Sequence, residues 1–248
     1  MKVVFDEEFH QVYTGDPAAD EGRMEAIMEV IGPHVQFVNC FPASQGDIDA
    51  VHSADHIDHV KRLGLHPIAS LAAGGAIKAA TTGITEPCFG LIRPPGHHAS
   101  SNSAWGFCFY NNMAIALEHL RRSGAIQTAY VLDIDLHFGD GTVNILQHRG
   151  YATIHNVSAH ERRSYLEEVR EEMDLVQADI IGISAGFDNH EQDWGGVLRT
   201  DDYRTIGQYV RGASNRNTGG CFAILEGGYN HRVLGHNVLA LIEGLSEG

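Results

Sequence analysis

Short apolar runs alternate with amphipathic stretches along most of this chain. Compact runs rich in β-branched and aromatic residues are typical of strands, and longer stretches with apolar residues on one face are typical of helices. We predict seven strands, at residues 3–5, 35–40, 88–92, 129–134, 151–155, 180–185 and 221–225. We predict eight helices, at residues 23–31, 53–63, 70–82, 112–122, 142–148, 165–177, 202–211 and 233–245.

This alternation determines the expected fold class. Strands that alternate with helices predict a parallel sheet with helices on both faces. The chain has 248 residues, enough to bury a substantial core, and it shows no repeat, low-complexity tract or obvious linker. We therefore expect one three-layer α/β domain over residues 1–248, with a central parallel sheet.

Polar residues follow four of the apolar runs directly, where a parallel sheet binds ligands beyond the carboxyl ends of its strands. The four transitions are CFGLI into RPPGHHA, AYVLDI into DLHFGDG, IIGISAGF into Asp188, and CFAIL into EGGYN. We expect these segments, far apart in sequence, to converge at one rim of the sheet.

The segment from Asp133 to His137 carries two carboxylates and an imidazole at alternate positions. In an extended strand Asp133, Asp135 and His137 would face one side, and Asp188 could supply a further carboxylate from another strand end. Two aspartates and one histidine around Zn²⁺ leave a position open for water, as a catalytic zinc requires. Taken alone, such a motif more often marks a solvated strand end with ordinary salt bridges.

Two adjacent histidines, His97 and His98, follow two prolines and a glycine that rigidify and turn the backbone. They could act as base and acid, with Asp133 and Asp140 as the available partners that set tautomer and pKa. Tyr229 follows paired glycines at another strand end and could donate its phenol to a developing oxyanion. On its own, Tyr229 is better explained as a packing residue.

Charge and cysteine content narrow the function classes. The formal net charge of −15 argues against general nucleic-acid binding and is compatible with cationic ligands. The four cysteines form no CxxC pair, which indicates buried free thiols in a reducing compartment. We see no secretory signal and no run long enough to span a membrane, and we expect a cytoplasmic protein.

Together, five stretches resemble the histone deacetylase and acetylpolyamine amidohydrolase superfamily. They are RPPGHHA (93–99), WGFCFYNNMAIA (105–116), VLDIDLHFGDGT (131–142), ISAGFDNHEQD (183–193) and LEGGYN (225–230). Their order and spacing match as well, and weaker matches at 46–63 and 72–80 extend the resemblance over nearly the whole chain. LEGGYN and SAGFD look more like the class II, bacterial and polyamine-deacetylase branches than class I.

The resemblance implies the arginase/deacetylase fold and a zinc-dependent amidohydrolase that releases acetate from an acetylated amine, either acetyl-lysine or acetylpolyamine. It implies zinc ligands at Asp135, His137 and Asp188, catalytic histidines at His97 and His98, supporting carboxylates at Asp133 and Asp140, carbonyl polarisation by Tyr229, and a substrate tunnel wall at Gly106 and Phe107. Fe²⁺ is the alternative metal, because a ligand set with two carboxylates is fairly hard. The resemblance also implies a structural K⁺ near the zinc, held by Asp133 and by backbone carbonyls around Asp135 and His137, with the Thr153 region as a weaker match.

The chain departs from its relatives after His155, where they carry a long glycine-rich segment with the second aromatic wall of the tunnel. Here His155 runs almost directly into the next helix, so we predict a shorter, more open tunnel, which Tyr165 cannot be assumed to close. A neighbouring subunit of a homo-oligomer could complete the site. Gly195 stands where some polyamine-selective relatives place a glutamate, which weakens the polyamine reading.

Two other functions stay open at this stage. An arginase-like ureohydrolase shares the fold and a DxH signature but uses two manganese ions. A non-catalytic acyl-amine sensor could keep the fold without turnover. His52, His56 and His59 could share one helical face as a second metal site, although an exposed polar face is the simpler explanation.

Overall fold

The computed structural model describes residues 1–217 and 219–247, and within them it contains one sheet of seven parallel strands. The strands lie in the order β2-β1-β3-β7-β6-β4-β5. Their bounds are β1 Lys2–Val4, β2 Gln36–Val38, β3 Cys88–Gly90, β4 Ala129–Asp133, β5 Ala152–Asn156, β6 Ile180–Ala185 and β7 Gly220–Leu225. Each predicted strand is present, and the predicted parallel sheet is confirmed.

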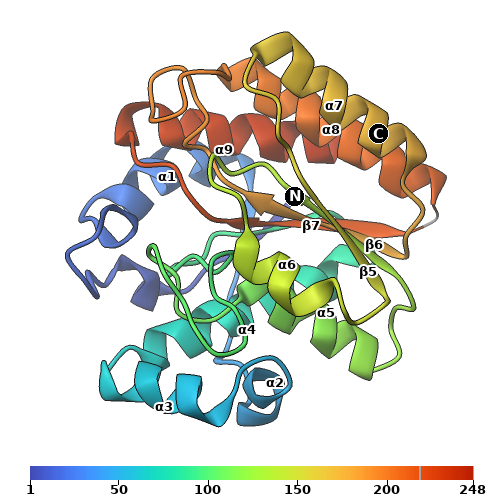
Figure 1. The fold of residues 1–248 in the computed structure, drawn as a ribbon. Helices are drawn as coiled ribbons and strands as arrows, with labels where there is room; N and C mark the ends of the chain where they lie inside the picture. Colours follow the sequence, from blue (N-terminus) through green and yellow to red (C-terminus); the bar gives the residue numbers. More distant parts are fainter. Residues whose placement is uncertain (218, 248) are drawn as a thin grey trace.

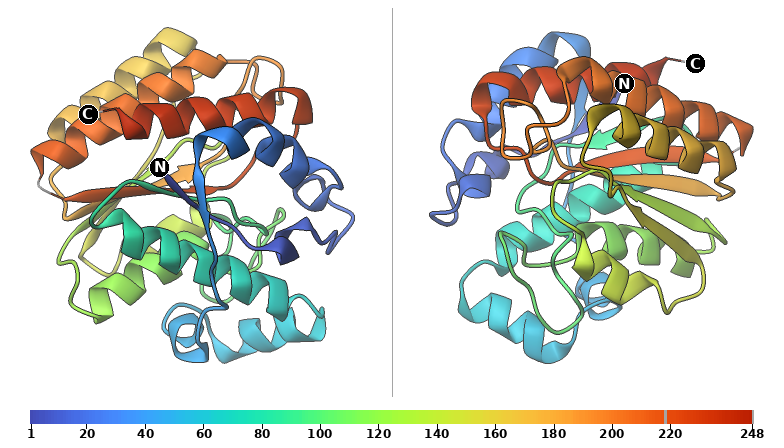
Figure 2. Two further views of the ribbon diagram at one scale, coloured as in Figure 1. Left: turned by 180° about the vertical axis from the view of Figure 1, so that it is seen from behind. Right: turned by 45° about the horizontal axis from the view of Figure 1, so that its top comes forward.

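Helices cover both faces of this sheet, which confirms the expected three layers (Figure 1). One layer contains α1 (Arg23–Ile31), α7 (Arg162–Leu175), α8 (Thr200–Arg216) and α9 (His231–Ser246). The opposite layer contains α4 (His66–Gly83), α5 (Asn112–Arg122) and α6 (Asp140–Leu146), with α2 (Gln45–Asp49) and α3 (Ala54–Arg62) at its outer edge. The two further views in Figure 2 show the same division.

The prediction missed the shortest helices and misplaced some helix ends. The missed elements are α2 and three 3₁₀ turns, Glu7–His10, Pro17–Ala19 and Gly32–His34. Elements this short present no periodic apolar face to detect. Helix α4 begins four residues before the predicted start because Pro67 occupies its first turn, where a missing N–H costs nothing.

Burial explains why the central strands read as continuous apolar runs. β3, β4, β6 and β7 are buried along their whole length because helices cover both faces. The helix α4 lies close beneath them. A Cβ added at Gly83 would come within 2.9 Å of the Cys221 carbonyl oxygen, so only glycine permits this approach to β7.

The strand order brings the four predicted segments together. β3, β7, β6 and β4 are consecutive neighbours, and because all are parallel, their carboxyl ends meet at the same edge. The segments that begin with Leu91, Glu226, Gly186 and Ile134 therefore leave the sheet side by side, as the sequence predicts.

Two further expectations concern the cysteines and membrane-spanning segments. The four cysteines are buried and unpaired, as predicted. In the part of the chain that the structure describes, no helix combines the length and apolar character needed to cross a bilayer.

The contact between α8 and α9 yields a stability test. A Cβ added at Gly207 would lie 2.7 Å from the Leu241 carbonyl oxygen and 2.9 Å from the Leu245 nitrogen, both backbone atoms. We predict that Gly207→Ala lowers the free energy of unfolding by about 1–3 kcal/mol, because overpacking outweighs the higher helix propensity of alanine. Urea denaturation measures this change.

The matched control is Gly212→Ala in the same helix. There an added Cβ would meet only the flexible Arg216 guanidinium, at 3.6 Å. This variant should gain up to about 1 kcal/mol, since only the propensity difference acts. Equal effects at the two positions would contradict the close helix contact.

Candidate active site

Asp135, His137 and Asp188 come together at the carboxyl ends of β4 and β6. The His137 Nδ1 atom lies 3.2 Å from Asp135 Oδ1 and 3.1 Å from Asp188 Oδ2. One ligand atom from each of the three residues lies within 4.8 Å of the others. The structure thus groups the three residues that the resemblance implies as metal ligands.

The local backbone differs from the extended strand assumed for this motif, because β4 ends at Asp133. Asp133 Oδ1 accepts a hydrogen bond from the Asp135 N–H, and Asp135 Oδ1 accepts one from the His137 N–H. Each carboxylate thus fixes the backbone two residues further on. Asp133 turns towards the histidine pair, whereas Asp135 turns towards Asp188.

The chemistry of this group fits a divalent cation. Asp135 and Asp188 are both buried, and within the described residues Asp188 Oδ2 pairs only with the His137 ring, 3.1 Å away. Burial and repulsion from Asp135 raise the pKa of Asp188 to about 6. The pKa of Asp135 is instead lowered, because nearby His97 and hydrogen bonds from His137 and Gly227 outweigh its burial. A bound cation would allow both carboxylates to stay ionised.

The tandem histidines each bind the carboxylate expected from the resemblance. His97 Nδ1 lies 3.1 Å from Asp133 Oδ2, and His98 Nδ1 lies 2.8 Å from Asp140 Oδ1. A carboxylate can only accept, so each Nδ1 carries the hydrogen and each Nε2 remains for chemistry. The two imidazole rings lie against each other at an interplanar angle of 40°, with their centroids 4.0 Å apart.

The environments of the two histidines separate their proton affinities. Burial disfavours charge on His97, but Asp135 and Asp133 outweigh it and hold the pKa of His97 well above its ordinary value. Burial and the neighbouring His97 lower the pKa of His98 to about 4, against the pull of Asp140. The pair can therefore combine a charged ring with a neutral one, which is the arrangement acid–base chemistry uses.

The loop after β7 brings Tyr229 to the same cavity. Gly227 N–H donates to Asp135 Oδ2 at 2.9 Å, which ties this loop to the candidate metal group. Asp193 Oδ2 accepts the N–H groups of Tyr229 and Asn230, both at 2.8 Å. Tyr229 is thus held by its backbone, with its ring at the cavity wall.

Three residues that support this loop were not singled out from the sequence. Buried Arg23 donates to the carbonyl oxygens of Gly228 and Glu226, at 2.9 and 2.7 Å. The Glu226 carboxylate accepts the Gly96 N–H at 2.7 Å, which joins the tyrosine loop to the histidine loop. Asp193 is the third. A charged residue in an apolar helix face is the only signal that could have indicated Arg23.

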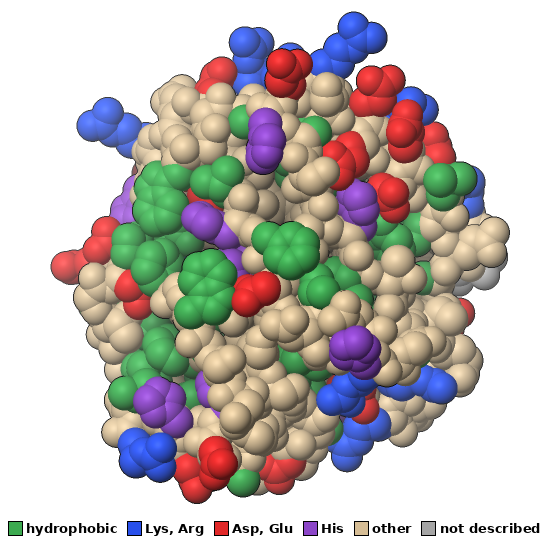
Figure 3. All heavy atoms as spheres, in the orientation of Figure 1, with side chains coloured by type: hydrophobic (Ala, Val, Ile, Leu, Met, Phe, Trp, Pro, Cys, Tyr) green, Lys and Arg blue, Asp and Glu red, His purple; other side chains and the backbone are tan. Residues whose placement is uncertain are grey.

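The cavity in front of these groups has a volume of about 110 Å³. It is lined by Pro95, His97, His98, Trp105, Gly106, Phe107, Cys108, His137, Trp194, Gly227 and Tyr229. Gly106 and Phe107 occupy the wall, as the resemblance implies, and the Phe107 ring meets Tyr229 edge-on with centroids 5.7 Å apart. Figure 3 shows apolar and histidine side chains gathered on the left of this face, with Lys and Arg mostly near its margins.

Trp194 lines the same cavity and supplies an aromatic wall beside Tyr229. Its ring packs on Tyr229 with centroids 4.2 Å apart and meets His137 edge-on at 6.0 Å. Tyr165, by contrast, is buried, and its hydroxyl donates to the Ile134 carbonyl oxygen. The short connection after β5 therefore leaves the mouth bordered by Trp194, and Tyr165 takes no part in it.

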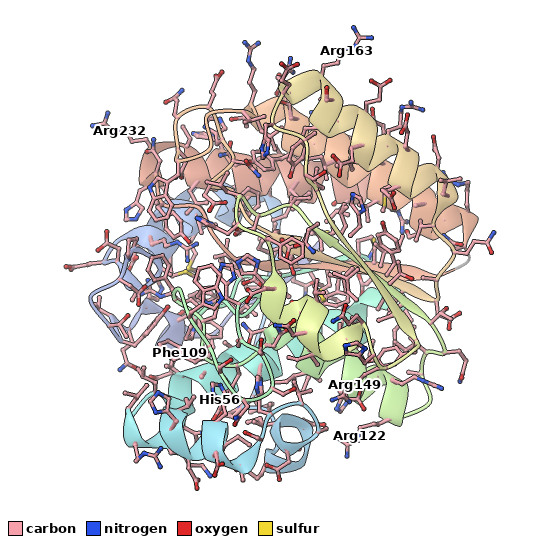
Figure 4. The ribbon with its side chains drawn as sticks, viewed as in Figure 1. His56, Phe109, Arg122, Arg149, Arg163 and Arg232 are labelled. Carbon is pink, nitrogen blue, oxygen red and sulfur yellow. The ribbon has the colours of Figure 1, made fainter. Side chains whose placement is uncertain are left out.

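The expectation of an exposed polar face at His52, His56 and His59 is confirmed for His59 but wrong for His52 and His56, whose side chains are buried. His52 bonds the Ser100 carbonyl oxygen and the Asn111 N–H, and His56 bonds the Phe109 carbonyl oxygen at 2.7 Å. Figure 4 shows His56 and Phe109 at the junction of α3 with this loop. The two histidines hold the loop that carries Phe107.

The fold is a parallel α/β sheet, and the site groups three possible metal ligands with two paired imidazoles and a tyrosine, as a metal-dependent hydrolase would require. Comparisons with known proteins show a related fold and hydrolytic relatives. A model of the histone deacetylase domain matches residues 63–169. The crystal structure of the HDA15 HD domain shares the fold, with a TM-score of 0.84 at 23% identity over 99% of this chain and 89% of that one.

Two curated relatives cover most of the chain. A probable deacetylase of Methanothermobacter thermautotrophicus is 30% identical, over 91% of this chain and 85% of that protein. A histone deacetylase-like amidohydrolase of Pseudomonas aeruginosa is 27% identical, over 90% of this chain and 74% of its own length. The chain belongs to the histone deacetylase family, and it is a hydrolytic enzyme of the deacetylase type.

The protonation of His137 predicts how metal uptake depends on pH. Hydrogen bonds to Asp135 and Asp188 raise the pKa of His137 to about 10 in the metal-free protein, so the ring is protonated at pH 7. A metal needs the neutral ring, so uptake at pH 7 should expel about one proton from His137. Titration of metal-free protein with ZnCl₂ in unbuffered solution, followed by pH-stat, measures the release.

The same argument predicts metal affinity that rises as the pH increases from 6 to 8. The control is His137→Ala, which should bind the metal weakly and release no proton from this position. Affinity that stays flat over this pH range in the wild-type protein would contradict the ligand role of His137.

The position of Trp194 predicts a binding defect. Trp194→Ala removes a wall of the mouth, so we expect KM to rise about five- to tenfold while kcat changes by less than about twofold. Steady-state kinetics on an accepted acetylated amine measures both. The control is Leu175→Ala, an exposed apolar residue on α7, which should alter neither constant. An unchanged KM in Trp194→Ala would show that Trp194 does not contribute to substrate binding.

Proposed function

We propose that this chain is a zinc-dependent deacetylase that hydrolyses the amide of an acetylated amine to acetate and free amine. The observation that carries the proposal is one cavity lined by the paired imidazoles, Tyr229 and His137, the last of which belongs to the Asp135–His137–Asp188 group. We assign residues 1–248 to one catalytic domain. Zinc suits a site with two carboxylates and one imidazole, and Fe²⁺ is the alternative native metal.

The reaction needs water activation, oxyanion stabilisation and protonation of the leaving amine. Bound at Asp135, His137 and Asp188, zinc would supply Lewis-acid activation of the water and the acyl carbonyl. His98, neutral and oriented by Asp140, takes the water proton at Nε2 as the new C–O bond forms. The Tyr229 hydroxyl donates to the oxyanion.

The C–N bond then breaks, and protonated His98 returns its proton to the amine nitrogen. His97, paired with Asp133, stays charged beside the reacting centre and stabilises the developing negative charge. Burial raises the pKa of Tyr229, so its phenol keeps the proton it must donate.

The proposed structural K⁺ near Asp133 needs one revision of its ligands. Thr153 pairs with Tyr130 in the ladder, three residues or about 10 Å along the strand from Asp133, and so lies too far away. Asn156 and Ser184 are the residues level with Asp133. The Ser184 hydroxyl is buried without a hydrogen-bond partner in the described residues, which makes it the better candidate oxygen.

The mouth favours a short acyl group on an amine of neutral or positive charge. The cavity is small, and its lining contains no lysine or arginine. The glutamate of some polyamine-selective relatives cannot stand at Gly195, because a Cβ there would lie 2.7 Å from Asn189 Oδ1 and 2.8 Å from Asn189 Cα. Acetyl-lysine and acetylpolyamine both remain candidate substrates.

The test combines metal content with a substrate panel. We expect one zinc per chain and turnover of at least one of an acetyl-lysine peptide, acetylputrescine and acetylspermidine. Tyr229→Phe should lower kcat about 10²–10³-fold and His98→Ala about 10²–10⁴-fold, with zinc still bound, because each removes one chemical role. Asp188→Asn should lose the metal.

Two results would select the other candidate functions. Two metals per chain together with urea release from a guanidino substrate would indicate a ureohydrolase. Tight binding of acylated amines with no turnover by the zinc-loaded protein would indicate a sensor.

A further inference from the structure

Trp105 occupies a position in the site that a tunnel wall alone does not explain. Its indole ring stacks on the His98 imidazole, with centroids 3.7 Å apart and an interplanar angle of 30°. The other side of the same imidazole faces His97, at 4.0 Å. His98 is therefore the middle ring of a three-ring stack.

Trp105 also contacts the partner of His98. The indole Nε1–H donates to both oxygens of the Asp140 carboxylate, at 3.0 and 2.9 Å. Asp140 Oδ1 thus accepts from His98 Nδ1 and from the indole at once. One side chain fixes the plane of the imidazole and the orientation of the carboxylate that sets its tautomer.

The different exposure of Asp140 and His98 shows why the contact with Trp105 matters. The Asp140 side chain is 35% exposed, whereas that of His98 is only 6% exposed. An exposed carboxylate can rotate and exchange its partner for water, which would release the His98 ring. The indole N–H donates to both carboxylate oxygens and so opposes this exchange.

The backbone places the indole there. Gly106 has φ of 60°, a left-handed conformation that glycine adopts without strain, and a Cβ added to it would approach His98 Cδ2 to 3.0 Å. The loop therefore passes directly over His98, and Trp105 is the side chain that precedes this turn. His52 and His56 hold the later part of the loop by hydrogen bonds to the Asn111 N–H and the Phe109 carbonyl oxygen.

We propose that Trp105 is a positioning residue of the deacetylation reaction, which holds the His98–Asp140 pair in its reactive geometry through ring stacking and the indole N–H together. The inference rests on the proposed function, in which His98 moves the proton. Trp105 acts through His98 and Asp140 and does not itself touch the reacting atoms.

The test is a double-mutant cycle between Trp105→Phe and Asp140→Asn. Phenylalanine keeps an aromatic ring over His98 but lacks the N–H. We expect Trp105→Phe to lower kcat about tenfold, less than the full contribution of a general acid–base group, with KM changed by less than about twofold. In the Asp140→Asn background the same substitution should change kcat by less than about twofold. The carboxylate through which Trp105 acts on His98 is already replaced in that background.

Two controls separate this role from a structural or binding one. The zinc content and melting temperature of Trp105→Phe should match the wild type, and its defect should lie in kcat, whereas that of Trp194→Ala should lie in KM. Trp194 is a useful comparison because it is as exposed as Trp105, at 53%, and borders the same cavity.

Three outcomes would overturn the inference. An active wild type with unchanged kcat in Trp105→Phe would refute it and leave the proposed function intact. Multiplying losses in the double variant would show that Trp105 does not act through Asp140. A wild-type protein that binds zinc but hydrolyses no acylated amine would refute the proposed function and this inference together.

Discussion

Two buried carboxylates that lie side by side, Asp135 and Asp188, are the constraint on which the site depends. Carboxylates so close in a buried site repel one another and lose their hydration, so their surroundings must supply positive charge or hydrogen bonds. The Leu136 and Gly227 N–H groups supply hydrogen bonds, and His137 supplies charge in the absence of a metal. The glycines of SAGFD and EGGY follow from the same constraint, because a Cβ at Gly186 or Gly227 would collide with Asp135.

The sequence predicts the sheet and the place of the site well, because both depend on local signals. Buried strands must be apolar along their whole length, and the chain then has to turn polar where they end. β4 and β6 illustrate this rule, since Asp133 and Asp188 stand at the points where their apolar runs stop. Helix ends are less predictable, as α4 shows, because no side-chain cap marks its start at His66.

The supports of the site carry no local signal. Arg23 and Gly228 are 205 residues apart, and nothing near either one indicates that the guanidinium donates to that carbonyl oxygen. His52 and His56 look like polar helix positions until the loop they hold is placed over them. The tertiary fold decides such pairings, so sequence patterns identify the groups that do chemistry better than the groups that hold them.

The short connection between β5 and α7 shows how a missing segment changes the rest of the mouth. Glu168 of α7 closes this connection by accepting the N–H groups of Ser158 and Ala159, both at 2.9 Å, and by pairing with His155. The connection thus ends at the rim without an aromatic side chain of its own over the cavity. The aromatic border comes instead from Trp105 and Trp194, whose segments are bound to Asp140, Asp188 and Asn189. The residues that border the mouth are therefore held in place by residues of the site itself.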